Sequence, residues 1–225
     1  MLYYYLAIAL LFLSMFISGF VNSNFRRYAK ERASSGLTGA QAAQRILRAN
    51  GIYDVQIRII PGNLTDNYNP GNKTLNLSDA VGNRSSISSI VVAAHECGHA
   101  IQHATAYGPL NIRKKLVPLA NVSSNLSYML IFLGLILQST DLVTFGAVLF
   151  SAIVLFNLVT LPVETNASKR ALHQITALRL LNQDELRGGK KVLRAAGMTY
   201  FVALLSAILQ LLRLLSIANR ERRDS

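Results

Sequence analysis

The sequence predicts a mainly α-helical integral membrane protein, and three observations support this fold class. Of the 225 residues, 51% are hydrophobic, yet the formal net charge is +12. Several apolar runs are long enough to cross a bilayer. Basic residues flank these runs, which is typical of membrane proteins with positively charged loops. Nucleic acid is not expected as a partner, because the Lys and Arg residues form no single stripe and no nucleic-acid motif accompanies them.

Three to four transmembrane helices are expected from the apolar runs. Three spans are predicted at residues 2–21, 116–137 and 142–161, and a fourth at 199–217. Gln210 and Arg213 weaken the fourth span, so an interfacial or re-entrant helix is an alternative there. We expect one domain, 1–225, in which the remaining residues form polar lobes at 22–115 and 162–198.

The charge distribution predicts the topology. The segment 22–117 carries 12 Lys and Arg residues and the segment 163–198 carries 7, whereas the turn at 138–141 carries none. By the positive-inside rule, both lobes are expected in the cytoplasm and the N-terminus outside. A fourth full crossing would place the C-terminal charges of Arg220, Arg222 and Arg223 outside the cell. The sequence therefore does not decide on which side of the membrane the C-terminal tail lies.

The first lobe is expected to contain a short amphipathic helix at 37–50 and a β-hairpin. Thr38 suits the N-cap of the helix, and Gly51 suits its end. Residues 54–60 alternate between apolar and polar, residues 74–77 form the returning strand, and a turn at 69–72 joins them. Such a hairpin could hold an extended peptide by strand addition; a purely structural hairpin is the alternative.

A helix beginning near Ile87, after a cap at Ser85 or Ser86, and ending by Pro109 carries the central motif, His95-Glu96-Cys97-Gly98-His99. The two histidines lie one helical turn apart on one face, so both imidazoles can bind one metal ion. Glu96 can then take a proton from a water molecule activated by that metal. A chance match in a chain of this length is rare. Cys97, the single cysteine, is expected to face away from the metal.

A catalytic zinc site needs a third protein ligand, and Glu164 is the favoured candidate. His103 lies about 12 Å along the helix axis from His95, too far to share its ion. Glu164 directly follows the returning apolar run, where an unpaired carboxylate is costly. A helix cap or a salt bridge is the alternative role for Glu164.

Three further residues are candidates for supporting the site. Asn166 and Arg170 are close enough in sequence to Glu164 to hold ligands in place. His173 could donate to an oxyanion, although an ordinary solvated helix residue is the alternative.

Three sequence blocks resemble the bacterial neutral zinc metallopeptidases of the YugP type, over nearly the whole chain; the blocks are 95–102, 162–172 and 64–68. The chain is more distantly similar to membrane proteases of the heat-shock HtpX type. The resemblance implies a membrane-bound zinc peptidase of the gluzincin kind with one zinc ion per chain. Its ligands would be His95, His99 and Glu164, and its base Glu96. The chain departs from the family pattern at Asn166, where Asp is expected; the missing charge would weaken metal affinity or water activation.

We therefore expect zinc-dependent hydrolysis of peptide bonds at the cytoplasmic face of a bacterial cell membrane. Its substrates would be unfolded or membrane-associated polypeptides, consistent with membrane protein quality control. The lipid bilayer is the other expected partner. An intramembrane protease is one alternative, but polar residues flank the motif on both sides. A non-catalytic membrane scaffold or chaperone with a vestigial zinc site is the other, and only Asn166 favours it. Substrate identity, cleavage preference and oligomeric state stay open.

Overall fold

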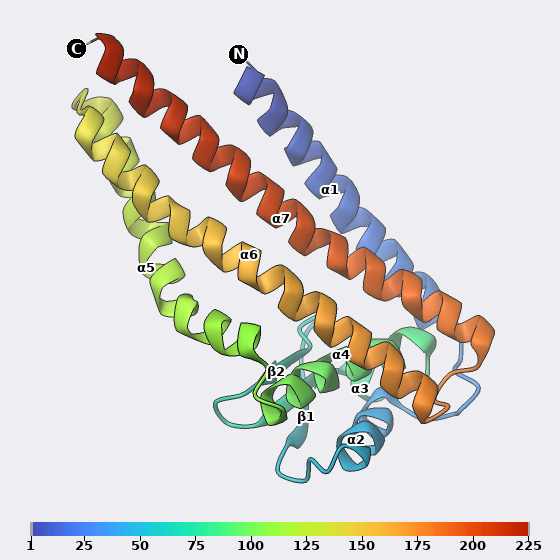
Figure 1. The fold of residues 1–225 in the computed structure, drawn as a ribbon. Coiled ribbons are helices and arrows are strands. Elements are labelled where there is room, and N and C mark those ends of the chain that lie inside the picture. The colour runs from blue at the N-terminus through green and yellow to red at the C-terminus, as the bar shows by residue number, and fades with distance from the viewer. Residues whose placement is uncertain (1, 225) are drawn as a thin grey trace. The chain divides into compact units, whose positions relative to one another are not determined.

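The computed structural model describes residues 2–224, with side chains for residues 5–219. Figure 1 shows the elements in chain order. They are α1 (Leu2–Ala29), α2 (Gly39–Ala49), β1 (Gln56–Ile60), β2 (Asn67–Asn69), β3 (Thr74–Ser78), α3 (Asp79–Gly82), α4 (Ile87–Ala104), α5 (Gly108–Ile136), α6 (Thr140–Ala177) and α7 (Gln183–Asp224). The chain forms two compact units. We call them the helical unit (Met1–Phe16, Gly108–Pro162 and Thr199–Ser225) and the mixed unit (Ile17–Tyr107 and Val163–Met198).

Within residues 2–224, four helices are long and apolar enough to cross a membrane, which confirms the mainly helical, membrane-type fold class. They are Tyr5–Ala29, Gly108–Ile136, Thr140–Ala177 and Gln183–Asn219. Each helix extends beyond the apolar run that identified it. Helix α5 begins at Gly108, so the basic residues at 113–115, at the end of the first polar lobe, lie within a helix.

In the second polar lobe, Pro162 after the third apolar run and the pair Gly188-Gly189 suggest breaks in the chain, but neither interrupts a helix. Helix α6 passes through Pro162 and ends at Ala177, and α7 passes through Gly188 and Gly189. The two glycines are positions of close packing: a Cβ at Gly189 would lie 2.6 Å from Cγ2 of Val91 on α4. A glycine pair can therefore stay helical where it lets another element approach, and the packing outweighs its low helix propensity.

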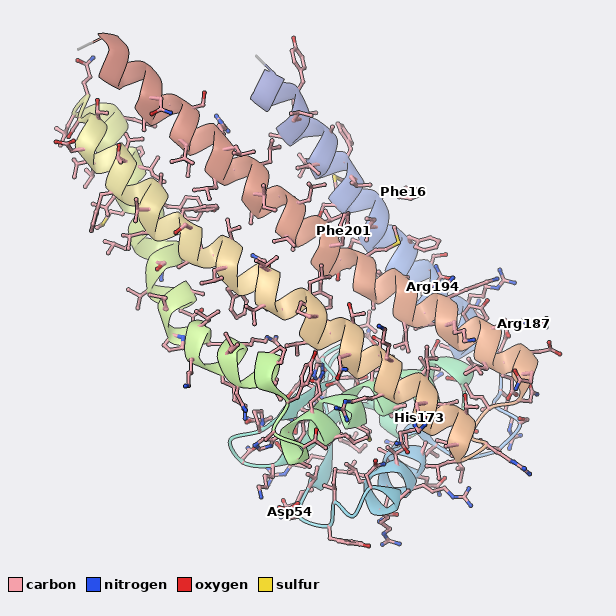
Figure 2. All side chains as sticks on the ribbon, viewed as in Figure 1. Phe16, Asp54, His173, Arg187, Arg194 and Phe201 are labelled. Atoms are coloured by element: carbon pink, nitrogen blue, oxygen red, sulfur yellow. The ribbon has the colours of Figure 1, made fainter. Side chains whose placement is uncertain are left out.

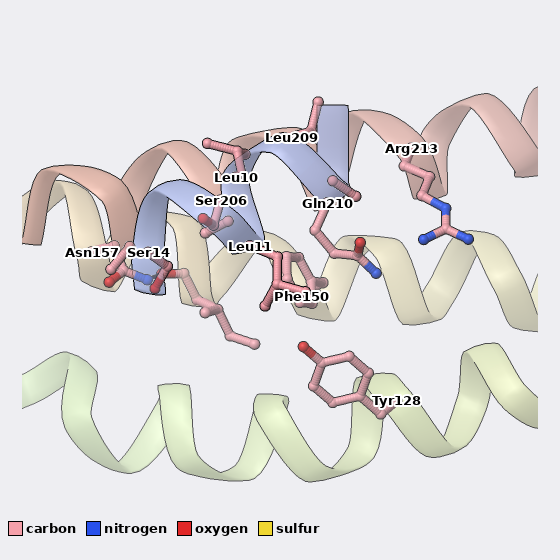
Figure 3. A pocket seen from close by; sticks show the side chains of 14 residues that line it. Leu10, Leu11, Ser14, Tyr128, Phe150, Asn157, Ser206, Leu209, Gln210 and Arg213 are labelled. Atoms are coloured by element: carbon pink, nitrogen blue, oxygen red, sulfur yellow. Dashed lines mark hydrogen bonds between the residues drawn. The ribbon is translucent and has the colours of Figure 1, made fainter. Parts of the chain in front are cut away.

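Within the helical unit, a cavity of about 460 Å³ is lined by residues of all four long helices. Figure 3 shows Gln210 and Arg213 of α7 at this cavity, together with Tyr128 and Asn157. The two polar residues that weakened the prediction of the fourth span thus line a cavity and do not interrupt α7. The expected placement of the C-terminal charges concerns side chains beyond residue 219, outside the described ones.

The mixed unit contains a three-stranded sheet in the order β1-β3-β2. Strand β3 pairs antiparallel with β2, and this pair forms the hairpin; β3 pairs parallel with β1. The expected antiparallel pairing of residues 54–60 with 74–77 is therefore wrong. The chain turns between β1 and β2 through positive φ angles at Gly62 (112°) and Leu64 (55°), and this turn makes room for β2. Leu75 and Leu77 are fully buried on the central strand.

Helix α4 lies at the centre of the core of the mixed unit. Its fully buried residues Ile90, Ala94 and Cys97 belong to one apolar cluster with residues of α2 and β3. Ser86 caps its N-terminus, because the Ser86 hydroxyl accepts a hydrogen bond from the Ser89 amide at 3.1 Å. A left-handed residue at Ala106 (φ 50°) follows its end. The helix that carries the motif is thus fixed by packing along its length.

Candidate metal centre

Three side chains converge in the mixed unit. His95 and His99 lie one turn apart on α4, and Glu164 lies on α6. Oε2 of Glu164 is 3.3 Å from Nε2 of His95 and 3.3 Å from Nε2 of His99. All three candidate ligand atoms lie within 4.8 Å of one another. The structure therefore brings together the two histidines of the motif and a carboxylate that lies 65 residues after His99 in the chain.

A close crossing of α4 and α6 makes this convergence possible. A Cβ built at Gly98 would lie 2.5 Å from the carbonyl oxygen of Ala167, 3.0 Å from its carbonyl carbon and 3.1 Å from its Cα. Only a glycine allows the two backbones to approach this closely. Gly98 lies beside His99, and Ala167 lies between Glu164 and Ser168, so the crossing point lies next to the candidate ligands.

A chain of hydrogen bonds orients His99. The amide nitrogen of Gln102 donates to the carbonyl oxygen of Val163 at 2.8 Å and to Oδ1 of Asn166 at 3.0 Å. Because both donors of the amide are used, its Oε1 faces His99 and accepts from Nδ1 of that ring at 3.0 Å. Nδ1 of His99 therefore carries the proton, and Nε2 is the nitrogen that can bind a metal.

The supporting residues differ in part from the expectation. Among the described residues, Asn166 forms no hydrogen bond with either histidine: its Oδ1 accepts from Gln102 and, at 2.8 Å, from Nε of Arg170. Gln102, which is fully buried, is the residue that contacts His99. Sequence reasoning did not assign it a role, although its position three residues after His99 on a helix was a signal.

Ser168 is a second residue that sequence reasoning missed. Its hydroxyl lies 3.2 Å from Nδ1 of His95. Ser168 follows Glu164 by four residues, so both side chains project from the same face of α6. Each histidine thus has a polar partner at Nδ1 while its Nε2 faces Glu164.

Glu96 is buried beside the cluster, with 8% of its surface exposed. Burial raises the pKa of its carboxyl, and the charge of Glu164 raises it further, whereas the two histidines lower it. A carboxyl with a raised pKa is a stronger base once it is ionised, as general-base catalysis requires. Cys97 points the other way, toward the carbonyl oxygen of Ala43 on α2, at 3.6 Å. This agrees with the expected buried thiol facing away from the metal.

The other two histidines lie outside the cluster. Nδ1 of His103 is 2.8 Å from the hydroxyl of Tyr68 on β2, one helical turn beyond His99. This hydrogen bond joins the edge strand of the sheet to the helix of the motif. His173, labelled in Figure 2, is an exposed residue of α6.

The cluster fits a zinc ion on three counts. Two imidazoles and one carboxylate are a known donor set for catalytic zinc. Bonds of about 2.0–2.1 Å in a tetrahedron place ligand atoms about 3.3–3.4 Å apart, which matches the two separations of 3.3 Å. The site also attracts positive charge: burial alone would lower the pKa of His99, but Glu164 and Glu96 raise it.

The chain belongs to a family of zinc metallopeptidases. The family described as "Putative neutral zinc metallopeptidase" matches residues 3–219. A similar protein of Bacillus subtilis (strain 168), named "Putative membrane protease YugP", is 46% identical over 217 residues, which cover 96% of each chain. No solved structure matches the chain. The family expected from the three sequence blocks is therefore confirmed.

The crossing of α4 and α6 predicts the effect of Gly98→Ala. The added methyl group would force the helices apart at the point where His99 faces Glu164, so we expect zinc binding to fall by at least tenfold. Metal content per chain after purification in detergent measures this. Gly108→Ala is the control, because a Cβ there meets no atom within 4 Å. Full zinc occupancy in Gly98→Ala would show that the ligands do not depend on this close approach.

The hydrogen bonds of Gln102 predict a loss of metal affinity in Gln102→Leu. His99 would lose the acceptor that orients its ring, and such losses weaken metal binding by about 10- to 100-fold. Competition with a chromophoric chelator measures the affinity. Gln174→Leu is the control, because Gln174 is a half-buried glutamine of α6 whose side-chain amide donates to Oδ1 of Asn50, away from the cluster. Equal affinity in Gln102→Leu and wild type would exclude this orienting role.

Proposed function

We propose that the chain is a membrane-bound, zinc-dependent peptidase in which His95, His99 and Glu164 hold the metal and Glu96 is the general base. The convergence of the three ligand atoms, with Glu96 directly after the first histidine, carries this proposal. The family and the Bacillus relative support it by their names. The donor set leaves a coordination position for a reactant, as in catalytic zinc sites.

Each residue has a distinct task in the proposed reaction. A zinc ion, when bound, supplies a Lewis acid that polarises the scissile carbonyl and lowers the pKa of a water molecule. Glu96 takes a proton from the attacking water and later passes it to the leaving amine. Gln102 and Ser168 keep Nε2 of each histidine directed at the site. The buried setting of Glu96 strengthens these electrostatic interactions.

We further propose that strand β2 holds the substrate as an extended chain. In the sheet order β1-β3-β2, β2 is an edge strand, and one of its edges pairs with no strand of the sheet. Tyr68 on β2 contacts His103, so this edge lies close to the helix of the motif. Strand addition would pair the substrate backbone with this edge. It suits unfolded or membrane-associated polypeptides, because folded segments cannot present an extended backbone.

The charge distribution supports a location at the cytoplasmic face of the bacterial cell membrane. The segments of the mixed unit carry most of the Lys and Arg residues, and the short turn between α5 and α6 carries none. The positive-inside rule places such basic segments in the cytoplasm. A peptidase in that position could degrade damaged membrane proteins, which is the quality-control role we propose.

Glu96→Gln tests the catalytic assignment. The amide keeps the shape of the side chain but cannot accept the proton, so we expect normal zinc content and a loss of turnover of about 10²- to 10⁴-fold. Cleavage of a dye-labelled unfolded protein by the full chain in detergent is the assay. Glu31→Gln, at an exposed position, is the control.

Two outcomes separate peptidase from scaffold. Undiminished turnover in Glu96→Gln would exclude Glu96 as the base. A wild-type chain that binds zinc but cleaves no unfolded or membrane-associated polypeptide would favour the non-catalytic membrane scaffold. Asn166, the residue that suggested this alternative, keeps its hydrogen bonds to Gln102 and Arg170, so the network itself is intact.

A further inference from the structure

A second cavity, of about 380 Å³, lies in the mixed unit between α6 and α7. Its wall contains three basic residues, Lys169 of α6 and Lys190 and Arg194 of α7, and no acidic residue. Leu172 and Leu193 supply an apolar part of the wall. Figure 2 labels Arg194 on α7.

The three cations of this cavity have no partner within the described part of the chain. Lys169, Lys190 and Arg194 are exposed, and none forms an ion pair or a side-chain hydrogen bond with a described residue. By contrast, Arg187 on the same helix pairs with Asp184 at 3.3 Å. Three like charges that line one cavity repel one another and favour an anion that joins them.

The position of the cavity along the helices indicates where this anion comes from. On α7, Arg194 precedes the predicted span at 199–217 by five residues, or about 8 Å of helix. The headgroup layer on each side of the hydrocarbon core is about 5–8 Å thick, so a bilayer centred on the predicted span places Arg194 at the depth of lipid phosphates. Lys169 and Lys190 lie about 12–14 Å from the nearest predicted span, and their flexible stems can reach back toward the headgroups.

The cavity lies on the Nδ1 side of His95, which under the proposed function is away from the reactants. Ser168 lines the cavity and also contacts Nδ1 of His95, whereas Nε2 of His95 faces Glu164. A peptide positioned for hydrolysis must lie on the Nε2 side of this ring. An occupant of the cavity would instead contact the site through Ser168, which makes an acidic side chain of the substrate the weaker candidate.

We propose that this cavity binds the phosphate-bearing headgroup of an anionic phospholipid. The phosphate lies among Lys169, Lys190 and Arg194, and Leu172 and Leu193 contact the apolar part of the lipid next to the headgroup. Basic pockets between helices at the cytoplasmic surface of a membrane are suited to such headgroups. The lipid would contact Ser168, whose hydroxyl is within hydrogen-bond distance of the candidate metal ligand His95.

Lipid retention by the full chain, measured by native mass spectrometry in detergent, tests this site. Wild-type protein is compared with a chain carrying Lys169→Gln, Lys190→Gln and Arg194→Gln. The matched control carries Arg45→Gln, Arg179→Gln and Lys191→Gln, three exposed basic residues that do not line the cavity. We expect wild type and control to retain phosphatidylglycerol in preference to phosphatidylcholine, and the cavity variant to bind phosphatidylglycerol more than tenfold more weakly.

Further arms of the experiment distinguish the source of the anion. Inorganic phosphate or an oligoglutamate peptide that displaces phosphatidylglycerol at equal concentration would overturn the lipid assignment in favour of a free anion or an acidic peptide. Equal retention by the cavity variant and the control would overturn the site. A thiol-reactive dye at the buried Cys97 reports whether each variant is folded. Should the triple variant unfold, Arg194→Gln alone must still weaken retention several-fold. None of these readouts requires peptidase activity.

Discussion

The close approach of α4 and α6 at Gly98 is the contact on which the rest of the site depends. It lies where two helices from distant parts of the chain cross with their backbones in contact. His95 and His99 flank Gly98 on α4, and Glu164 and Ser168 flank Ala167 on α6. One crossing therefore supplies the candidate ligands and the partner of His95. A larger residue at Gly98 would force the two backbones apart, and a small shift is enough to disturb ligand atoms that lie 3.3 Å from one another.

The crossing also concentrates polar groups in an otherwise apolar interior. Glu96, Gln102 and Glu164 are buried beside helix residues that are packed into the core. Burying such groups costs several kcal/mol for each ion unless partners satisfy them. The amide of Gln102 uses both donors and its acceptor, and the carboxylate of Glu164 lies against two imidazoles. A divalent metal ion between Glu164 and the two histidines would balance the negative charge of the buried carboxylate. Helix α4 thus belongs both to the hydrophobic core and to the candidate metal centre.

Local patterns in the sequence predicted the parts of the site that lie on one helix. The spacing of His95 and His99 requires only helix geometry, and Glu164 was recognisable by its place after an apolar run. The spacing of Gln102 from His99 was a local signal, but the orientation of its amide depends on Val163 and Asn166 of α6. Ser168 escaped notice because its contact with His95 depends on how α4 and α6 cross, which no local pattern encodes. The parallel pairing of β1 with β3 and the continuity of α6 through Pro162 were missed for the same reason: distant packing outweighs the local turn and proline signals. The small residue Gly98 was the one local sign of the crossing.

The most direct test of this account is the zinc content of the full chain in detergent, compared between wild type and Glu164→Gln. The account predicts about one zinc per wild-type chain and a loss of most of it in Glu164→Gln, because the amide removes the charge that balances the metal. Glu185→Gln, on the mixed unit but away from the cluster, should retain its zinc. Zinc-free wild type that is folded, or full zinc in Glu164→Gln, would contradict a centre formed by His95, His99 and Glu164.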